Sequence, residues 1–272
     1  MKRCIVLEKP VGQTPLEAIT AWKAKNPAYA DTPACYAGRL DPMASGKLLV
    51  LLGDECRRQK DYHGLDKEYA IEVVLDLATD TGDALGIPRA AGNDTEMDRK
   101  KLAGALKRLL GTHAVPYPAY SSKTVNGKPL FQYALEGSLN TIEIPVHDET
   151  IYAMRVSEVR TMAAPKLAER IDTLVAQAPR ADEPAKALGA DFRQDAIGSA
   201  WKELFASASL PDRSFTVVSL RVTCASGTYM RTLACRIAAG LGTSGFALSI
   251  HRTRIGRHLR LGPLGLWTKE YS

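Results

Sequence analysis

Apolar and polar residues alternate along several stretches of the chain, and this alternation predicts β-strands. The clearest case is residues 67–77, where every second residue is apolar: Tyr69, Ile71, Val73, Leu75 and Leu77. Residues 217–224 repeat this pattern with Val218, Leu220, Val222 and Cys224. Shorter apolar stretches predict an edge strand at 5–7 and a strand pair at 142–144 and 151–159.

Other stretches carry the spacing or the end signals of helices. Thr14, Pro15 and Glu17 form a helix start, with a capping hydroxyl, a proline at the first helical position and a carboxylate in the first turn. Residues 98–110 are amphipathic and end at Gly111, as a C-terminal glycine predicts. Further helices are predicted at 131–135 and 233–241.

The composition changes between about residues 161 and 212, where Ala, Pro and charged residues dominate. Helical patterns at 166–175 and 196–205 lie within this segment. It is either an inserted helical hairpin or a flexible arm, and the sequence leaves both open.

A single acid, Asp41, occupies a distinctive place between Gly38 and Pro42, shortly before the apolar run 48–52. Pro42 biases Asp41 away from helical backbone angles, so we expect Asp41 at the tip of a loop. A loop on a packed platform is one way to expose a nucleophile, but aspartate is also a common helix cap or turn residue. The run 48–52 is either a central strand or a short buried helix.

Four other polar segments have local interpretations. Residues 54–60, which include Arg57, are a solvated helix face or a phosphate contact. Residues 79–86 lack the ligand order of a calcium loop and are interpreted as a structured turn. Asn126-Gly127 predicts a hairpin turn. Residues 226–228, which precede a helix, are an anion site made by backbone amides or merely a cap.

Composition sets broad limits on the class of protein. The 272 residues are 45% hydrophobic and 24% charged, which is ordinary for a soluble globular protein. The formal net charge of +6 tilts the surface modestly towards polyanions and does not by itself establish a nucleic-acid partner. No stretch has the length of a signal peptide or a membrane span.

The five cysteines are widely spaced and form no Cys-x-x-Cys motif: Cys4, Cys35, Cys56, Cys224 and Cys235. This spacing indicates neither a zinc site nor a disulfide framework. We therefore expect a soluble cytoplasmic protein without a metal.

Taken in order, these landmarks resemble the TruB-type pseudouridine synthases, whose bacterial members modify the T-loop uridine of tRNA. The resemblance covers about residues 3–155 and 214–257. Each motif is weak alone, but the ordered set is specific. The main matching motifs are Gly38-x-Leu40-Asp41-Pro42, Lys67-x-Tyr69, Thr79-Asp80-Thr81-x-Asp83, Val125-Asn126-Gly127-Lys128, Ser226-Gly227-Thr228-Tyr229-Met230-Arg231 and Arg252-Thr253-Arg254-Ile255-Gly256.

The resemblance implies the residues of an active site. Asp41 is the catalytic aspartate, Tyr69 stacks on the target base, and Arg231 pairs with Asp41 and keeps it charged and oriented. Taken alone, Tyr69 is equally well a core aromatic at a strand end, and Arg231 a cation at a helix start without a partner. The implied reaction is an isomerisation that needs no cofactor. Substrate-binding positions implied with these are Tyr36, Arg39, Lys67, Tyr229, Ile250 and Arg57.

The chain departs from the family pattern at the base-flipping position. TruB-type enzymes carry a histidine wedge where this chain has Tyr36, and residue 39, usually small, is an arginine. The Gly38-Arg39-Leu40-Asp41 string is similar to pseudouridine synthases that act on ribosomal RNA or several RNAs, where this arginine can serve as the wedge. We therefore hypothesise that Arg39 supports the flipped-out base, with Tyr36 stacking nearby.

Two larger departures concern RNA binding. Family members often continue into a small RNA-binding domain after the arginine-rich closing motif, and we expect this domain to be absent here or reduced to a tail. The segment 161–212 is not explained by the family. We expect it to supply part of the RNA grip, and its deletion to weaken RNA binding with little loss of fold.

Together these observations predict an α/β (α+β) pseudouridine synthase fold. We expect one catalytic domain, 1–272, with a mixed, mainly antiparallel sheet flanked by helices and the helical insert at 161–212. The expected function is tRNA pseudouridine-55 synthase, active as a monomer on the T-arm. The alternatives are a pseudouridine synthase for another RNA, and a non-catalytic RNA-binding or chaperone protein.

Overall fold

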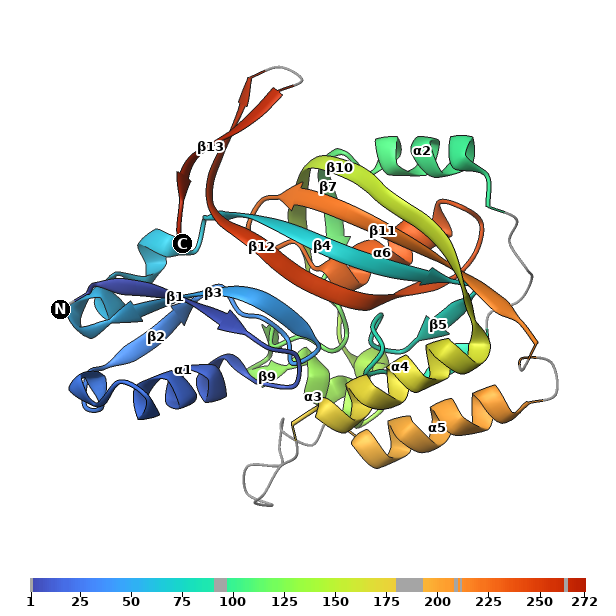
Figure 1. Ribbon diagram of the computed structural model, residues 1–272, viewed down its shortest axis with the longest axis horizontal. Coiled ribbons are helices and arrows are strands. Elements are labelled where there is room, and N and C mark those ends of the chain that lie inside the picture. Colours follow the sequence, from blue (N-terminus) through green and yellow to red (C-terminus); the bar gives the residue numbers. More distant parts are fainter. Residues whose placement is uncertain (1, 91–96, 180–192, 208–209, 211, 262–263) are drawn as a thin grey trace.

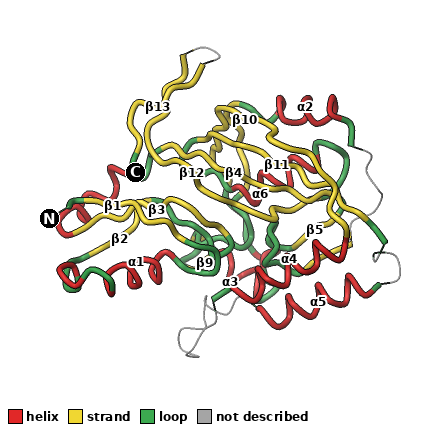
Figure 2. The backbone as a smooth tube through the Cα atoms, in the orientation of Figure 1, coloured by secondary structure: helices red, strands yellow, loops and turns green. Residues whose placement is uncertain are grey.

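The computed structural model describes residues 2–90, 97–179, 193–207, 210, 212–261 and 264–272 (Figures 1 and 2). Within these residues, nine strands form one sheet. They are β1 (Cys4–Lys9), β2 (Ala34–Ala37), β3 (Ala44–Leu52), β4 (Asp66–Leu75), β7 (Gly111–Pro116), β10 (Val146–Ala163), β11 (Ser214–Cys224), β12 (Gly245–Leu261) and β13 (Leu264–Glu270).

The sheet is mixed and mainly antiparallel, which confirms the predicted fold class. Its order is β1-β3-β12-β4-β11-β10-β7, with β2 paired to β3 and β13 to β12. β12 and β3 are parallel where Ile250 faces Ala44 and Arg252 faces Gly46, and the other pairs are antiparallel. Gly46 has φ +102°, and a Cβ there would lie 2.3 Å from the Arg252 carbonyl oxygen. Glycine therefore permits the close approach that joins these two strands.

The helices cover the sheet at several places. They are α1 (Pro15–Ala24), α2 (Arg99–Arg108), α3 (Leu130–Leu135), α4 (Ala164–Gln177), α5 (Gln194–Ala206) and α6 (Met230–Ala239). A capping box of Thr14 and Glu17 starts α1 as predicted. Short 3-10 helices lie at Pro27–Tyr29, Gly53–Tyr62 and Leu139–Thr141. No helix within the described ranges is long and apolar enough to cross a membrane.

The main core lies between α6, α2 and the sheet. Alternate residues of β4, among them Ile71 and Val73, pack there with Leu220 of β11 and Leu233 of α6. The period-two prediction for β4 is confirmed as far as Leu75. Its extension to residue 77 is wrong, because Asp76 has φ +66° and ends the strand before β5 (Leu77–Thr79) begins.

A second predicted strand is also wrong. Residues 142–144 follow a 3-10 helix, precede Pro145 and are not in a strand. β10 begins at Val146 and pairs with β7 and β11. The hairpin predicted at Asn126-Gly127 is present between β8 (Thr124–Val125) and β9 (Lys128–Pro129), with φ values of +50° and +78° that suit the two turn residues.

Both helices predicted within 161–212 form, and they pack against each other as α4 and α5, with β6 (Pro88–Ala90) beside α5 (Figure 1). Ile171 of α4 and Trp201 of α5 are buried in a core cluster with Phe215 and Phe246. Deleting this pair would expose that cluster, so the expectation of little loss of fold is not supported by the packing.

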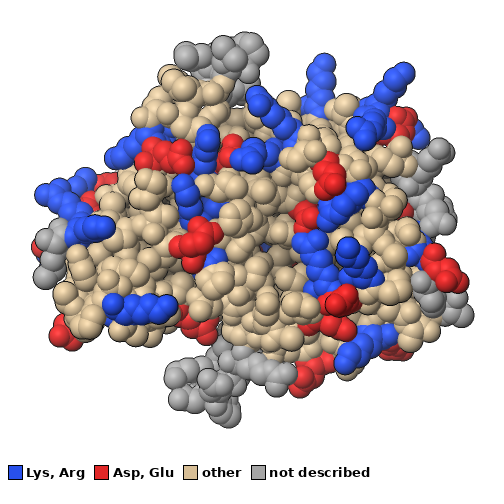
Figure 3. Space-filling model, viewed as in Figure 1, with Lys and Arg blue, Asp and Glu red and all other residues tan. Residues whose placement is uncertain are grey.

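Charges of both signs are interleaved on the face of the molecule shown in Figure 3. Across β4, β10 and α4, Glu72 pairs with Arg160 and Arg170. Farther along β4, Arg221 of β11 pairs with Glu68 at 2.9 Å. The view in Figure 3 thus shows mixed charges and no uniform basic patch.

Candidate active site

Asp41 lies in a tight turn between β2 and β3. Gly38 adopts φ +86°, and the Ala44 amide donates a hydrogen bond to the Asp41 carbonyl oxygen at 3.0 Å. The Gly12 amide donates to the Pro42 carbonyl oxygen at 2.9 Å. The turn interpretation of Asp41 is confirmed, and the helix-cap alternative is wrong because strand β3, and not a helix, follows. Residues 48–52 belong to this strand.

Arg252 of β12 binds the backbone on both sides of this turn, a role that the sequence did not predict. Arg252 is 1% exposed, and its guanidinium donates hydrogen bonds to the carbonyl oxygens of Lys47 at 2.7 Å, Gly38 at 3.1 Å and Arg39 at 3.3 Å. These three bonds tie both sides of the Asp41 turn to the neighbouring strand. Only the position of Arg252 in the closing motif hinted at it, because its partners lie more than 200 residues earlier.

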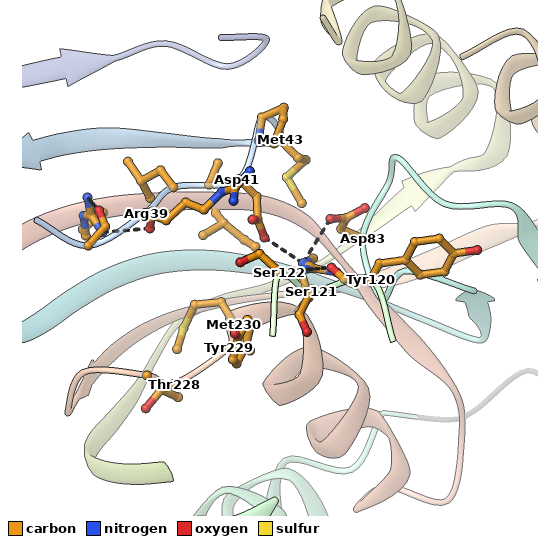
Figure 4. Close-up of a pocket in the computed structure, with 18 of the residues that line it drawn as sticks. Arg39, Asp41, Met43, Asp83, Tyr120, Ser121, Ser122, Thr228, Tyr229 and Met230 are labelled. Carbon is orange, nitrogen blue, oxygen red and sulfur yellow. Dashed lines mark hydrogen bonds and ion pairs between the residues drawn. The ribbon is translucent and has the colours of Figure 1, made fainter. Parts of the chain in front are cut away.

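Arg231, in the first turn of α6, is buried and pairs with Asp41 as expected. Its Nε donates to Asp41 Oδ2 at 2.9 Å and lies 3.5 Å from Asp83 Oδ2 (Figure 4). The two terminal nitrogens donate to the carbonyl oxygens of Thr81 at 2.9 Å and Tyr120 at 3.0 Å. The guanidinium is thus held by two carboxylates and two backbone carbonyls, which fixes its direction towards Asp41.

The two carboxylates beside Arg231 differ in exposure. The Asp41 side chain is 37% exposed, whereas that of Asp83 is 7% exposed. Burial raises the pKa of Asp83 to about 6, and the Arg231 guanidinium opposes part of the rise. Burial tends to lower the pKa of Arg231, but Asp41 and Asp83 outweigh it and raise that pKa. Asp41 is therefore the accessible member of a buried charge cluster.

A cavity of about 600 Å³ opens in front of Asp41. Most of the expected site residues line it, although they come from four separate parts of the chain: Tyr36, Arg39, Asp41, Lys67, Tyr69, Tyr229, Arg231 and Ile250. A cavity of this size is within the range of small-molecule and nucleotide sites.

Arg57 is not among the described residues that line the cavity. Its side chain is 85% exposed on the 3-10 helix Gly53–Tyr62 and lies 3.5 Å from Asp54. A phosphate contact at Arg57 stays a prediction.

Tyr69 and Lys67 lie on the wall formed by β4. Tyr69 is 8% exposed, and burial raises the pKa of its hydroxyl while the adjacent Arg252 opposes the rise. Lys67 is 4% exposed and donates to Ser226 Oγ at 2.8 Å. Burial, and then the neighbouring Arg252, lowers the pKa of Lys67 to about 8. Ser226 thus belongs to a hydrogen-bonded corner of the cavity.

Tyr229 precedes α6 and is held by aromatic and polar contacts. Its amide donates to Oε1 of the buried Glu149 at 2.9 Å. Its ring meets His147 edge-on at 5.7 Å between centroids, and His147 stacks on Tyr117 at 4.0 Å. This packing fixes one aromatic wall of the cavity.

Among the described residues, no group of three or more His, Cys, Asp or Glu side chains is arranged to bind a metal ion. The polar groups around Asp41 instead form ion pairs and hydrogen bonds with one another. Such an arrangement positions one carboxylate at the wall of a cavity, as nucleophilic or acid–base chemistry requires.

Comparison with known proteins identifies the family. Residues 28–172 match the model of the TruB family pseudouridylate synthase (N terminal domain). A tRNA pseudouridine synthase B of Burkholderia mallei is 30% identical over 252 residues, covering 93% of this chain and 64% of the relative. The tRNA pseudouridine synthase B of Cupriavidus metallidurans is 28% identical over 252 residues, covering 93% of this chain and 62% of the relative. The chain thus spans less than two thirds of the length of these relatives.

A solved structure shows the same fold. The crystal structure of a Cbf5-Nop10-Gar1 complex matches with a TM-score of 0.53 at 19% identity, over 93% of this chain and 48% of that chain. The family-model match covers more than half of the chain, from β2 through the Asp41 loop to α4. This chain therefore belongs to the TruB family.

Proposed function

We propose that this chain is a pseudouridine synthase that isomerises a uridine in the T-loop of tRNA. The observation that carries the proposal is the exposed carboxylate of Asp41, ion-paired to buried Arg231 at a cavity with tyrosine walls. Family membership and the name of the relatives, tRNA pseudouridine synthase B, support the same reaction and substrate.

The reaction keeps every non-hydrogen atom of the nucleotide. The bond between ribose C1′ and uracil N1 breaks, the base turns, and a bond forms between C1′ and C5. The proton on C5 leaves and N1 gains one. Asp41 acts as nucleophile or base in this sequence, at the sugar or at the base, and Arg231 holds its carboxylate in the productive direction.

The tyrosines and Ile250 provide the pocket for the detached base. Tyr69 and Ile250 lie on adjacent strands, β4 and β12, and Tyr229 faces the cavity from the start of α6. Flat rings on the walls favour stacking on a uracil, and the enclosure limits its diffusion. Because Tyr69 is buried, its hydroxyl remains protonated at neutral pH and is suited to donating a hydrogen bond to the base.

A uridine within a folded loop must leave its stack before it reaches Asp41, at a cost of a few kcal/mol. Arg39 and Tyr36 both line the cavity; Arg39 lies in the turn that contains Asp41, and Tyr36 lies in β2, which leads into this turn. Arg39 is our proposed wedge, with Tyr36 beside it. Arg39→Ala should lower both the single-turnover rate and RNA affinity; unchanged values for both would refute the wedge.

A pseudouridine synthase for another RNA is the second candidate. It is favoured by Arg39 and Tyr36 in place of the family's small residue and histidine. The two candidates share the chemistry and differ in the RNA presented to the cavity.

The test measures tritium release from 5-tritiated uridine in transcripts of an unmodified tRNA and of ribosomal RNA. A second tRNA transcript carries cytidine at the T-loop position. Release from tRNA that disappears with the U→C change supports the proposal. Release that survives the change, or that occurs only with ribosomal RNA, supports the second candidate. Tight binding without release from any RNA would indicate a chaperone and overturn both.

A further inference from the structure

We propose that Arg193, from the segment between β10 and β11, is a positioning residue for the Asp41–Arg231 pair and acts through Asp80 and Tyr120. This inference rests on the proposed function and deepens it. It also gives the segment 161–212 a role at the site that the sequence did not suggest.

Arg193 directly precedes α5 and reaches into the wall of the cavity. Its two terminal nitrogens donate to the two oxygens of Asp80 at 2.7 and 3.3 Å, a fork-to-fork ion pair. The same guanidinium lies over the ring of Tyr120, 4.6 Å from its centroid. The Arg193 side chain is 22% exposed and that of Asp80 is 15% exposed, so the pair is largely shielded from water.

Asp80 collects further hydrogen bonds that hold the 79–86 loop. The Tyr120 hydroxyl donates to its Oδ2 at 2.9 Å and the Ile87 amide to its Oδ1 at 2.8 Å. Arg193 therefore joins three points: the start of α5, the loop at Asp80, and the segment that contains Tyr120.

The next contacts lead to Arg231. The Tyr120 carbonyl oxygen accepts one Arg231 nitrogen at 3.0 Å, and the carbonyl oxygen of Thr81, the residue after Asp80, accepts the other at 2.9 Å. Both backbone acceptors of Arg231 are thus supplied by residues that Arg193 contacts or that adjoin its ion-pair partner. Asp41, Asp83 and Tyr120, which are labelled in Figure 4, all contact the Arg231 guanidinium.

The helices provide a rigid base for this contact. Trp201 of α5 is 1% exposed and donates from Nε1 to the Ala84 carbonyl oxygen at 3.2 Å. Ile197 of α5 is buried with Ile171 of α4 in the same core cluster. The 79–86 loop is consequently braced at both ends, at Asp80 by Arg193 and at Ala84 by Trp201.

The test compares Arg193→Ala and Arg193→Lys with Arg170→Ala. Arg170 is a suitable control because it is on α4 of the same helical pair and pairs with Glu72, away from the cavity lining. Single-turnover tritium release at saturating enzyme, the Kd for the same RNA, and Tm are measured for each variant.

We expect Arg193→Ala to lower the single-turnover rate about tenfold or more, because small displacements of catalytic groups are costly, with Kd changed less than about twofold. Arg193→Lys should recover part of the rate, and added guanidinium should raise the rate of Arg193→Ala but not that of Arg170→Ala. The Arg193→Ala/Asp80→Asn double variant should be no slower than the slower single variant, since both changes break one connection.

Three results would overturn the inference. They are a rate within about twofold of wild type, a loss seen equally in Arg170→Ala and following Tm, and a loss confined to Kd. The NMR signal of the Arg231 Nε–H provides a readout independent of activity. In Arg193→Ala it should shift and exchange faster with water, and an unchanged signal would count against the role of Arg193. If wild type acts on no RNA, the proposed function fails, and this signal still decides whether Arg193 positions Arg231.

Discussion

At the scale of single residues, the site depends on the acceptors that surround the buried guanidinium of Arg231. The Arg231 guanidinium is buried against Asp41, Asp83 and two backbone carbonyls. A buried charge is tolerated only when it is paired and hydrogen-bonded, so these four acceptors explain why an arginine is stable there. They also explain its orientation towards the accessible carboxylate.

Arg231→Lys keeps the positive charge but replaces the planar fork by a single ammonium. One nitrogen cannot reach acceptors placed around a guanidinium, so we expect the single-turnover rate to fall by about 100-fold while most of the fold remains. Circular dichroism and tritium release measure the two effects. Arg221→Lys, a change in a surface pair on β11 that is 51% exposed, should leave the rate within about twofold. Equal rates for the two variants would contradict the role of Arg231.

The raised pKa of Asp83 predicts that both stability and activity depend on pH. Its pKa is raised from 3.8 to about 6, so between these values the folded chain binds a proton that the unfolded chain does not. The contribution of this carboxyl to stability is therefore most favourable at low pH and is lost as pH rises through that window. Activity should change in the opposite direction, because neutral Asp83 leaves Arg231 with one charged partner among the two described carboxylates.

We therefore expect the single-turnover rate of wild type to fall as pH decreases through about 6. In Asp83→Asn this inflection should be absent and the rate low throughout. An unchanged inflection in Asp83→Asn would assign the titration to another group.

At the scale of elements, β12 is the support of the catalytic loop. Through Arg252 it binds the carbonyl oxygens of Gly38, Arg39 and Lys47, and through Gly46 it approaches β3 closely enough to pair with it. The Asp41 turn is thereby fixed to the centre of the sheet rather than left as a free loop.

Arg252→Leu should destabilise the protein, since buried carbonyl oxygens lose their donor at about 1–3 kcal/mol each. We expect the free energy of unfolding to fall by about 3 kcal/mol or more, with a lower rate because the Asp41 turn loosens. Urea denaturation measures the stability. Arg254→Leu, two residues along the same strand and 42% exposed, should cost less than about 1 kcal/mol. An equal loss in the free energy of unfolding for the two variants would show that the buried hydrogen bonds of Arg252 contribute no more than an exposed arginine.

The elements that the sequence predicted correctly are those set by local chemistry. Alternation at β4, the capping box at α1 and the Asn126-Gly127 turn each act within a few residues. The predictions that failed concern positions where contacts between residues far apart in the sequence determine the structure. Asp76 leaves the strand where its amide bonds to the Ser244 carbonyl oxygen at 2.8 Å, and Arg252 meets partners over 200 residues away. Arg193 is a similar case, because its ion pair with Asp80 depends on how α5 packs.

At the scale of the whole molecule, one cavity gathers residues from four distant motifs. Tyr36 and Asp41 come from the N-terminal part, Tyr69 from β4, Arg231 from α6 and Ile250 from β12. The ordered motifs resemble the family, and this resemblance predicted that they form one site. The spacing of the motifs along the chain did not predict it. The formal net charge is +6, and Figure 3 shows basic and acidic side chains interleaved on one face of the molecule.

We propose that the carboxylate of Asp41, held by Arg231, carries out the isomerisation. The most direct measurement is single-turnover tritium release from T-loop-labelled tRNA by wild type and by Asp41→Asn, with Kd and Tm determined for both. We expect Asp41→Asn to keep the fold and to bind RNA with similar affinity, but to release no tritium above background. Release by Asp41→Asn at a rate near that of wild type would contradict this proposal.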